Sequence, residues 1–213
     1  MTTRYILRGA LIALVLTAPI AASAQTGDQL LARLRQHYAR LSSVSASFTQ
    51  TMSSPYGSSE RFSGTLVAQG DRYRLEAGPQ VFVTDGRTTW LHDRRANRVV
   101  INTYVPNQTA FSPTTFLSTY SSRYRVTRAT PSGSGSNRIY TLQLVPKSRS
   151  EMFESVTLVM RNRDNTVTRI EMRDVNGSTI RYDLQNVQAN PRVPAGTFTF
   201  TPPRGAEVVD MRS

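Results

Sequence analysis

The chain contains no cysteine. It can therefore form no disulfide, and it has no thiol that could carry the lipid anchor of a bacterial lipoprotein. Long hydrophobic runs are also missing, because the longest apolar stretch has about a dozen residues, whereas a membrane-spanning helix needs ~20. We expect a protein without disulfides and without a membrane anchor.

The first 24 residues have the pattern of a secretory signal peptide. Arg4 and Arg8 form a basic start, residues 10–21 form a short apolar run, and Ala22-Ser23-Ala24 supplies the small residues of a cleavage site. We expect export, with cleavage after Ala24. The remaining residues, 25–213, have the length of one domain with its own hydrophobic core.

Lysine is nearly absent, since Lys147 is the only lysine among 26 basic residues, against 14 acidic ones. The resulting net charge of +12 is of the kind found in nucleic-acid-binding proteins. The arginines, however, are spread along the whole chain, and their longest run is Arg94-Arg95. We therefore predict no nucleic-acid partner and place most of the arginines on the solvent side of a sheet.

Groups that support catalysis or metal binding are scarce. The chain has two histidines, His37 and His92, and neither lies in a pattern that would complete a hydrolytic triad. The turn at 174–177 lacks the further acidic ligands of a calcium loop, and the glycines at 133–135 lack the lysine of a phosphate-binding loop. We expect no enzyme activity, no metal and no cofactor.

One amphipathic helix is expected directly after the signal peptide. Thr26 and Gln29 have the spacing of a capping box, which marks a helix start. Apolar residues then recur on one side of a helix, at Leu30, Leu31, Leu34, Tyr38 and Leu41. This pattern predicts a helix that packs on a core.

From Ser45 onward the pattern is that of antiparallel strands. Short stretches rich in Val, Thr, Phe, Tyr and Ile alternate with turn residues such as Asp85-Gly86 and Asn176-Gly177. The sequence therefore predicts a meander with one buried face. The expected strands are 47–52, 61–69, 72–77, 80–84, 88–93, 98–104, 124–128, 138–145, 155–162, 167–173, 178–187 and 197–200.

Two segments interrupt this meander. Residues 105–121 carry an apolar cluster after Ser112-Pro113, which predicts a short helix lying on the sheet. Residues 129–137, rich in serine and glycine, predict a hairpin tip. A sheet with one apolar face and two such helices either encloses a hydrophobic cavity or forms a filled core, and periodicity alone is compatible with both.

Three segments, in order along the chain, carry motifs of one known family. Residues 198–210, Phe-Thr-Phe-Thr-Pro-Pro-Arg-Gly-Ala-Glu-Val-Val-Asp, are similar to a family ending of the form Phe-x-Phe-x-Pro-Pro-x-Gly-x-x-Val. Residues 41–50 are similar to the helix-to-strand junction of the same family, and residues 83–90 to its Val-x-Asp-Gly-x-x-x-Trp hairpin. Through these motifs the chain resembles the periplasmic lipoprotein carrier family LolA over nearly all of residues 25–213.

The resemblance implies a mainly β fold, an incomplete antiparallel β-barrel of about eleven strands, open at one side, with an α-helical lid over a hydrophobic cavity. It implies a soluble, monomeric periplasmic chaperone that takes lipidated proteins from an inner-membrane LolCDE-type ABC transporter. The cargo would pass to an outer-membrane acceptor, LolB-like or of another kind. It implies transfer without catalysis.

The resemblance also places the residues that would contact acyl chains. Trp90 at the hairpin and Phe111, Phe116 and Leu117 in the helical segment are the lid and cavity candidates. The expected barrel face consists of Leu66, Tyr73, Leu75, Leu142, Leu144, Leu158, Met172, Tyr182 and Leu184.

One family feature is unmatched. Where the family commonly has an Arg-Pro pair before the strand with Tyr73, this chain has Ala68-Gln69-Gly70-Asp71. Arg72 and Arg74 are the two candidates to replace the arginine that the family links to cargo transfer.

Two other functions compete with that of a carrier. The same fold would suit a regulatory module that senses lipids or lipoproteins. An exported lipid-modifying hydrolase would depend on His92 as its base, and the sequence supplies no constellation around that histidine.

Overall fold

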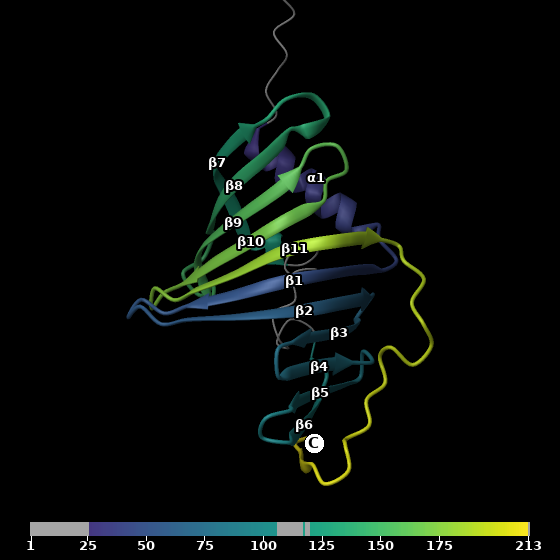
Figure 1. Cartoon of the computed structure of the whole chain (residues 1–213). Coiled ribbons are helices and arrows are strands. Elements are labelled where there is room, and N and C mark those ends of the chain that lie inside the picture. The colour runs from purple at the N-terminus through teal and green to yellow at the C-terminus, as the bar shows by residue number, and fades with distance from the viewer. Residues whose placement is uncertain (1–25, 106–116, 118–119, 213) are drawn as a thin grey trace, which may run out of the picture.

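The computed structural model describes residues 26–105, 117 and 120–212. In this part of the chain, helix α1 (Gly27–Ala39) accompanies one twelve-stranded sheet (Figure 1). Two short 3-10 helices, η1 (Tyr120–Arg123) and η2 (Gly135–Asn137), lie between strands. The strands are β1 (Val44–Ser53), β2 (Ser59–Gln69), β3 (Arg72–Ala77), β4 (Gln80–Thr84), β5 (Thr88–Asp93), β6 (Arg98–Thr103), β7 (Tyr124–Ser132), β8 (Ile139–Pro146), β9 (Phe153–Arg161), β10 (Val167–Asp174), β11 (Thr179–Ala189) and β12 (Glu207–Asp210).

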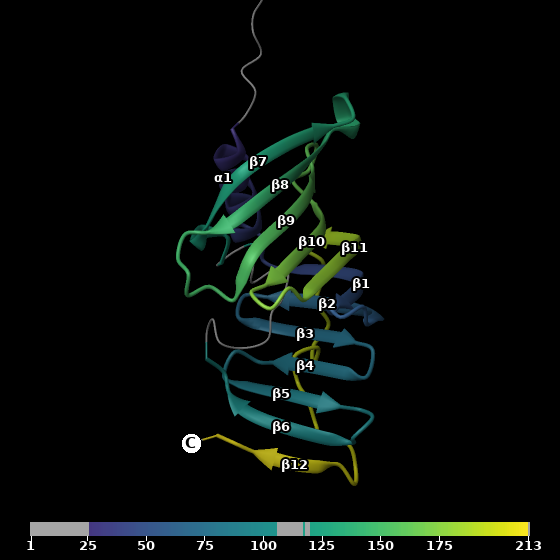
Figure 2. The same cartoon turned by 90° about the vertical axis from the view of Figure 1, so that its left-hand side faces the viewer.

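The sheet is built from two antiparallel meanders. Its strand order is β12-β6-β5-β4-β3-β2-β1-β11-β10-β9-β8-β7, so β1–β6 and β7–β11 each follow the chain and meet where β1 pairs with β11. β12 adds to the edge of the first meander in parallel with β6 (Figure 2). The sheet is open and does not close into a barrel. The expected mainly β, open antiparallel fold is confirmed, with twelve strands.

Eleven of the expected strands are present, with ends that shift by a few residues. The expected strand at 197–200 is wrong. There the chain forms turns, in which the Thr199 hydroxyl donates to the Gly196 carbonyl at 2.8 Å. The last strand is instead β12, a four-residue segment whose adjacent Val208 and Val209 give no clear alternation.

Helix α1 begins as its sequence predicts. The Thr26 hydroxyl accepts from the Gln29 amide at 3.3 Å, and the Gln29 side chain accepts from the Thr26 amide at 2.9 Å. At the other end, the Val167 amide donates to the Tyr38 hydroxyl at 3.1 Å, which ties the helix to the start of β10. No helix in the described ranges is long and apolar enough to cross a membrane.

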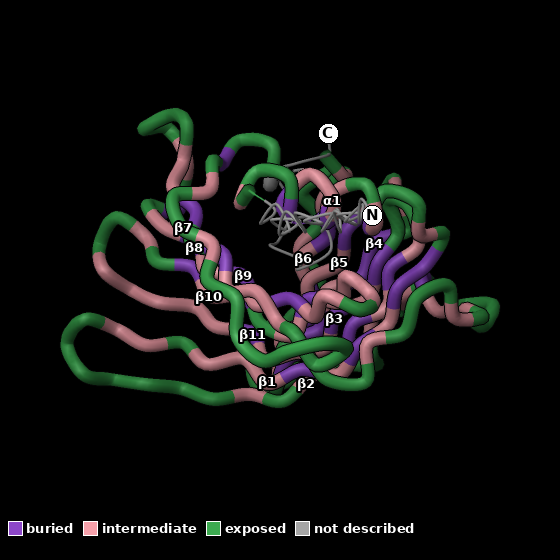
Figure 3. Tube along the Cα trace, turned by 90° about the horizontal axis from the view of Figure 1, so that it is seen from above, coloured by how far each residue is buried: buried purple, intermediate pink, exposed green. Residues whose placement is uncertain are grey.

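The sheet curves around α1 (Figure 3). We call the face toward α1 the inner face and the opposite one the outer face. The buried residues of α1 join the buried apolar residues of the inner face in one core cluster, in which most side chains from β8, β9 and β10 are fully buried. The expected helix at 105–121 lies largely outside the described residues, of which Leu117 is helical and buried.

The junction of the two meanders is packed around a glycine. The Phe48 ring of β1 meets the Tyr182 ring of β11 edge-on, with centroids 5.5 Å apart. On the other side of β1, Gly64 lies opposite Phe48. A Cβ on Gly64 would collide with the Phe48 ring and with the Glu76 carbonyl oxygen. Glycine is therefore required for the close approach of β1, β2 and β3.

Gly64→Ala should lower the free energy of unfolding by about 2 kcal/mol or more, because the added methyl has no room and the backbone must shift. Urea denaturation measures the change. Thr65→Ala is the control, since Thr65 is exposed on the next position of β2, and we expect it to cost less than about 1 kcal/mol. Equal losses in the two variants would contradict this packing.

Candidate functional site

Most of the residues expected to contact acyl chains lie together on the inner face. Nine of them belong to the one buried core cluster, and Leu184 is half-buried and packs against it. The nine are Leu66, Tyr73, Leu75, Leu117, Leu142, Leu144, Leu158, Met172 and Tyr182.

Strand register makes this apolar surface continuous. Leu142 of β8 lies opposite Leu158 of β9, which lies opposite Ile170 of β10, and Ile170 lies opposite Tyr182 of β11. Directly opposed residues of antiparallel strands point to the same face. The inner face therefore presents an unbroken row of large apolar side chains across four strands, and β1, β2 and β3 extend it through Leu66 and others.

Three expected lid and cavity residues are not part of this cluster. Phe111 and Phe116 lie outside the described residues. Trp90 lies opposite Val83, which lies opposite Arg74, so it points to the outer face. There its ring stands 6.5 Å from the Phe200 ring. Trp90 is thus separated by the sheet from the residues with which it was grouped.

A second apolar layer on the outer face explains the position of Trp90. The segment that follows β11 runs across the outer side of β4, β5 and β6 before it forms β12 (Figure 2). Phe198 is buried in this layer, and the Phe200 ring lies 5.6 Å from the buried His92 ring. We call this set the outer layer; its other members on the sheet are Val81, Val83, Val99 and Ile101. The outer layer was not predicted from the sequence, although the Phe-Thr-Phe alternation at 198–200 is typical of a segment that docks on a sheet.

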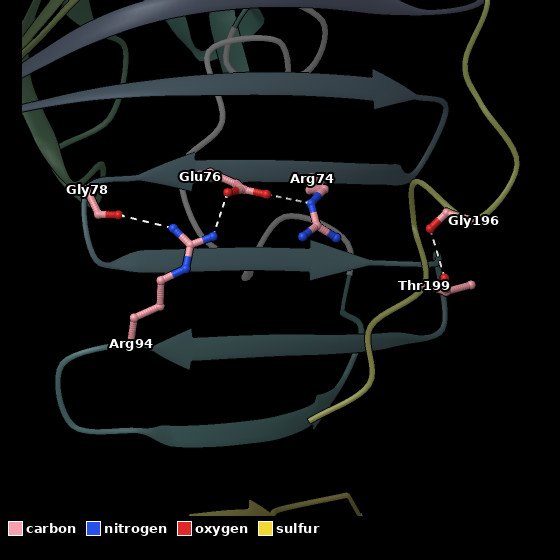
Figure 4. Close-up of polar contacts among 6 residues, drawn as sticks. All are labelled: Arg74, Glu76, Gly78, Arg94, Gly196 and Thr199. Atoms are coloured by element: carbon pink, nitrogen blue, oxygen red, sulfur yellow. Dashed lines mark hydrogen bonds and ion pairs between the residues drawn. The ribbon is translucent and has the colours of Figure 1, made fainter. Parts of the chain in front are cut away.

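Neither arginine considered for cargo transfer faces the inner side. Tyr73 and Leu75 point inward, so Arg72 and Arg74 of the same strand point outward. The Arg72 guanidinium lies 5.1 Å from the centre of the Phe198 ring, in cation–π contact. Arg74 donates to Glu76 at 2.8 Å, and Glu76 also accepts from Arg94 at 2.6 Å (Figure 4). Both arginines are held on the outer face by these contacts.

The histidines have packing partners. The His37 ring meets the Tyr38 ring edge-on at 5.2 Å, and burial lowers the pKa of His37. His92 is buried in the outer layer, where Val81 and Val99 lie opposite it on the neighbouring strands. Among the described residues, no group of three or more histidine and carboxylate side chains could hold a metal ion.

One surface pocket formed by the described residues is poorly suited to acyl chains. The pocket between the tips of the β1–β2 and β10–β11 hairpins has a volume of about 350 Å³. Serine, threonine and carboxylate side chains make up most of its wall. Long apolar chains need an apolar surface, which places the candidate site on the inner face.

Residues 39–201 match the model of a family described as Outer membrane lipoprotein carrier protein LolA. A protein of Bordetella avium (strain 197N) named outer-membrane lipoprotein carrier protein is 30% identical over 215 residues, which cover 98% of this chain and 100% of that protein. A protein of the same name from Methylibium petroleiphilum is 28% identical over 182 residues, 83% of this chain and 87% of that protein.

One solved structure has a similar fold. The crystal structure of an uncharacterized conserved protein from Thermus thermophilus superimposes with a TM-score of 0.54 at 15% sequence identity. The match covers 87% of this chain and 99% of that one. The open sheet of this chain is therefore shared with a distant structural neighbour.

Because Trp90 is the only tryptophan, its fluorescence reports on the outer layer. We expect Phe200→Ala to shift the emission maximum of the folded protein to longer wavelength, since removing the Phe200 ring admits water to Trp90. Leu144→Ala, on the inner face, should cost about 2–5 kcal/mol of stability and leave the emission maximum of the folded protein unchanged. If Leu144→Ala shifted the emission maximum and Phe200→Ala did not, Trp90 would lie on the inner face, which would contradict this assignment.

The ion pairs of Glu76 predict a pH dependence. Burial alone would raise the pKa of Glu76, but hydrogen bonds from Arg94 and Arg74 outweigh it and hold the pKa below its ordinary value. A lowered folded-state pKa stabilises the fold above the unfolded pKa of ~4.3, and this stabilisation is lost as the pH falls through the folded value. The stability advantage of the wild type over Glu76→Gln should therefore shrink between about pH 5 and pH 3. A pH-independent difference in denaturation midpoint would contradict this.

Proposed function

The chain belongs to the LolA family of outer membrane lipoprotein carrier proteins, and we propose that it carries lipoproteins from the inner to the outer membrane by holding their acyl chains on the inner face. The observation that carries this proposal is the continuous apolar surface of the open sheet, from β8 to β3. The proposed task is binding and transfer, with no bond made or broken.

Export follows from the signal peptide predicted at residues 1–24. We place the protein in the periplasm, where it would receive lipidated proteins from a LolCDE-type ABC transporter and give them to an outer-membrane acceptor. A carrier that works between two membranes has to remain detached from both. The sequence supports this through its lack of a cysteine for lipid attachment.

Transfer requires moderate affinity. Burial of an acyl chain contributes ~0.8 kcal/mol per methylene, so about ten buried methylenes supply about 8 kcal/mol, which corresponds to a dissociation constant of about 1 μM. The inner-face residues are already buried in the described structure, so an acyl chain enters only when the elements packed on them shift. The cost of that shift lowers the net affinity and allows release. α1 is one such element, since its apolar residues complete the core cluster.

A dipalmitoylated cysteine peptide should bind the protein and raise its melting temperature. At a concentration of 100 times the dissociation constant, binding adds ~2.7 kcal/mol of stability, which for a domain of this size is a shift of about 5–10 °C. The same peptide without acyl chains should leave the melting temperature unchanged. Absence of binding by the acylated peptide would refute the proposal.

A pair of aspartate variants locates the site. Leu184 of β11 is half-buried on the inner face, and Val159 of β9 is half-buried on the outer face. Leu184→Asp should weaken peptide binding at least tenfold, because a carboxylate would replace an apolar contact. Val159→Asp, which introduces the same charge on the other face, should bind as the wild type does. Equal effects of the two variants would move the site away from the inner face.

A transfer assay separates the carrier from a sensing module with the same fold. Protein loaded with the acylated peptide is mixed with vesicles that contain an outer-membrane acceptor. A carrier delivers the peptide to these vesicles. A module that only senses lipoproteins retains it.

A further inference from the structure

A row of polar side chains interrupts the apolar inner face at one end of the first meander. Tyr73 of β3 lies opposite Thr84 of β4, Thr84 lies opposite Thr89 of β5, and Thr89 lies opposite Asn102 of β6. Tyr73 belongs to the buried core cluster of the inner face. Because opposed residues share a face, all four side chains point to that same face. We call them the polar row.

Two hydroxyl groups of the polar row are buried without a partner among the described residues. Tyr73 is 6% exposed and Thr89 is 4% exposed. Within the part of the chain that the structure describes, neither the Tyr73 hydroxyl nor the Thr89 hydroxyl makes a hydrogen bond. By contrast, the Thr84 hydroxyl accepts from the Gly86 amide at 3.1 Å. An unpartnered buried hydroxyl costs stability, so two of them in one row need a reason.

The chemistry of the polar row suits an uncharged acceptor. Burial, together with the neighbouring Tyr104, raises the pKa of Tyr73 to about 12, so its hydroxyl stays protonated and can donate. Thr89 supplies a second donor. The arginines of β3, Arg72 and Arg74, point to the outer face and offer no charge here. Neutral hydroxyl donors favour a carbonyl oxygen over a phosphate or a carboxylate, which would bring an unpaired charge into this buried site.

We propose that the polar row binds the ester carbonyl oxygens through which acyl chains join the lipid head of the cargo. This inference rests on the proposed function and adds a polar subsite to it. The polar row lies next to the turns at 70–71 and 85–87, where β3, β4 and β5 begin or end. Acyl chains would extend from it over the apolar part of the inner face, and the peptide attached to the lipid head would leave past the turns at 70–71 and 85–87.

Ester and ether ligands test the subsite. The first pair of probes is a cysteine peptide with an S-glyceryl group that carries two palmitoyl esters, and the same peptide with two hexadecyl ethers, which lack the carbonyls. With two hydrogen bonds at stake, we expect the wild type to bind the ester about tenfold more tightly than the ether. The double variant Tyr73→Phe with Thr89→Val should bind both equally.

Tyr124→Phe is the matched control. The Tyr124 hydroxyl donates to the Phe153 carbonyl at 3.3 Å, so its loss should lower the melting temperature and leave the ester preference unchanged. Tyr73→Phe removes a hydroxyl that makes no hydrogen bond within the described residues. Without ligand, this variant should therefore be as stable as the wild type or more stable. This combination of unchanged stability and lost ester preference would not arise from a merely structural Tyr73.

The outcomes separate this inference from the proposed function. Equal binding of ester and ether by the wild type, or an ester preference that survives in the double variant, overturns the polar subsite and leaves the carrier function standing. Failure of both peptides to bind overturns both. Dipalmitoylglycerol is the free-lipid probe, which should bind more weakly than the ester peptide; tighter binding would assign the polar row to a free lipid and overturn its role with lipidated cargo.

Discussion

The twelve-stranded sheet has one long apolar face that has to be kept from water, and the rest of the structure depends on this constraint. Alternation along β1, β8, β9, β10 and β11, interrupted by register shifts at Ser45/Ser47 and at Val167/Arg169, places apolar side chains on the inner face. The pairing of β1 with β11 joins the two meanders into one surface. A closed barrel surrounds its inner face on all sides with its own strands. An open sheet instead needs cover, to which α1 contributes, and cover that packs without covalent attachment can be displaced by a ligand with apolar chains.

The two meanders differ in how they are packed. β7 to β11 carry arginines and carboxylates on the outer face, such as Arg169 with Asp183 at 2.6 Å. β4 to β6 are packed on both faces, because the segment after β11 covers their outer side with Phe198 and Phe200. A strand group packed on both faces resists deformation more than one packed on a single face. β4 to β6 are therefore held from both sides, whereas β7 to β11 pack on apolar residues only at the inner face.

Much of this could be read from the sequence, and the failures have physical causes. The capping box at Thr26 and the alternation of the long strands predicted α1 and eleven strands, since local patterns decide those elements. The resemblance of the hairpin at 83–90 predicts Trp90 as a lid residue, but a hairpin motif fixes the position of Trp90 on β5 and not the face of the sheet to which it points. The segment around Phe198 has the alternation of a strand because docking on a sheet favours the same pattern. β12 was missed because it is short and is fixed by parallel pairing with β6. The predicted positions of Phe111 and Phe116 stay predictions.

An apolar inner face with a polar row at the strand ends of the first meander suits a ligand with long chains and a carbonyl-bearing head. Photo-cross-linking tests this most directly, with an acylated peptide whose palmitoyl chains end in a diazirine and mass spectrometry of the adducts. We predict adducts on inner-face residues such as Leu158, Ile170 and Tyr182. Adducts on the outer layer, at Val83 or Phe198, or no adducts at all, would contradict the account.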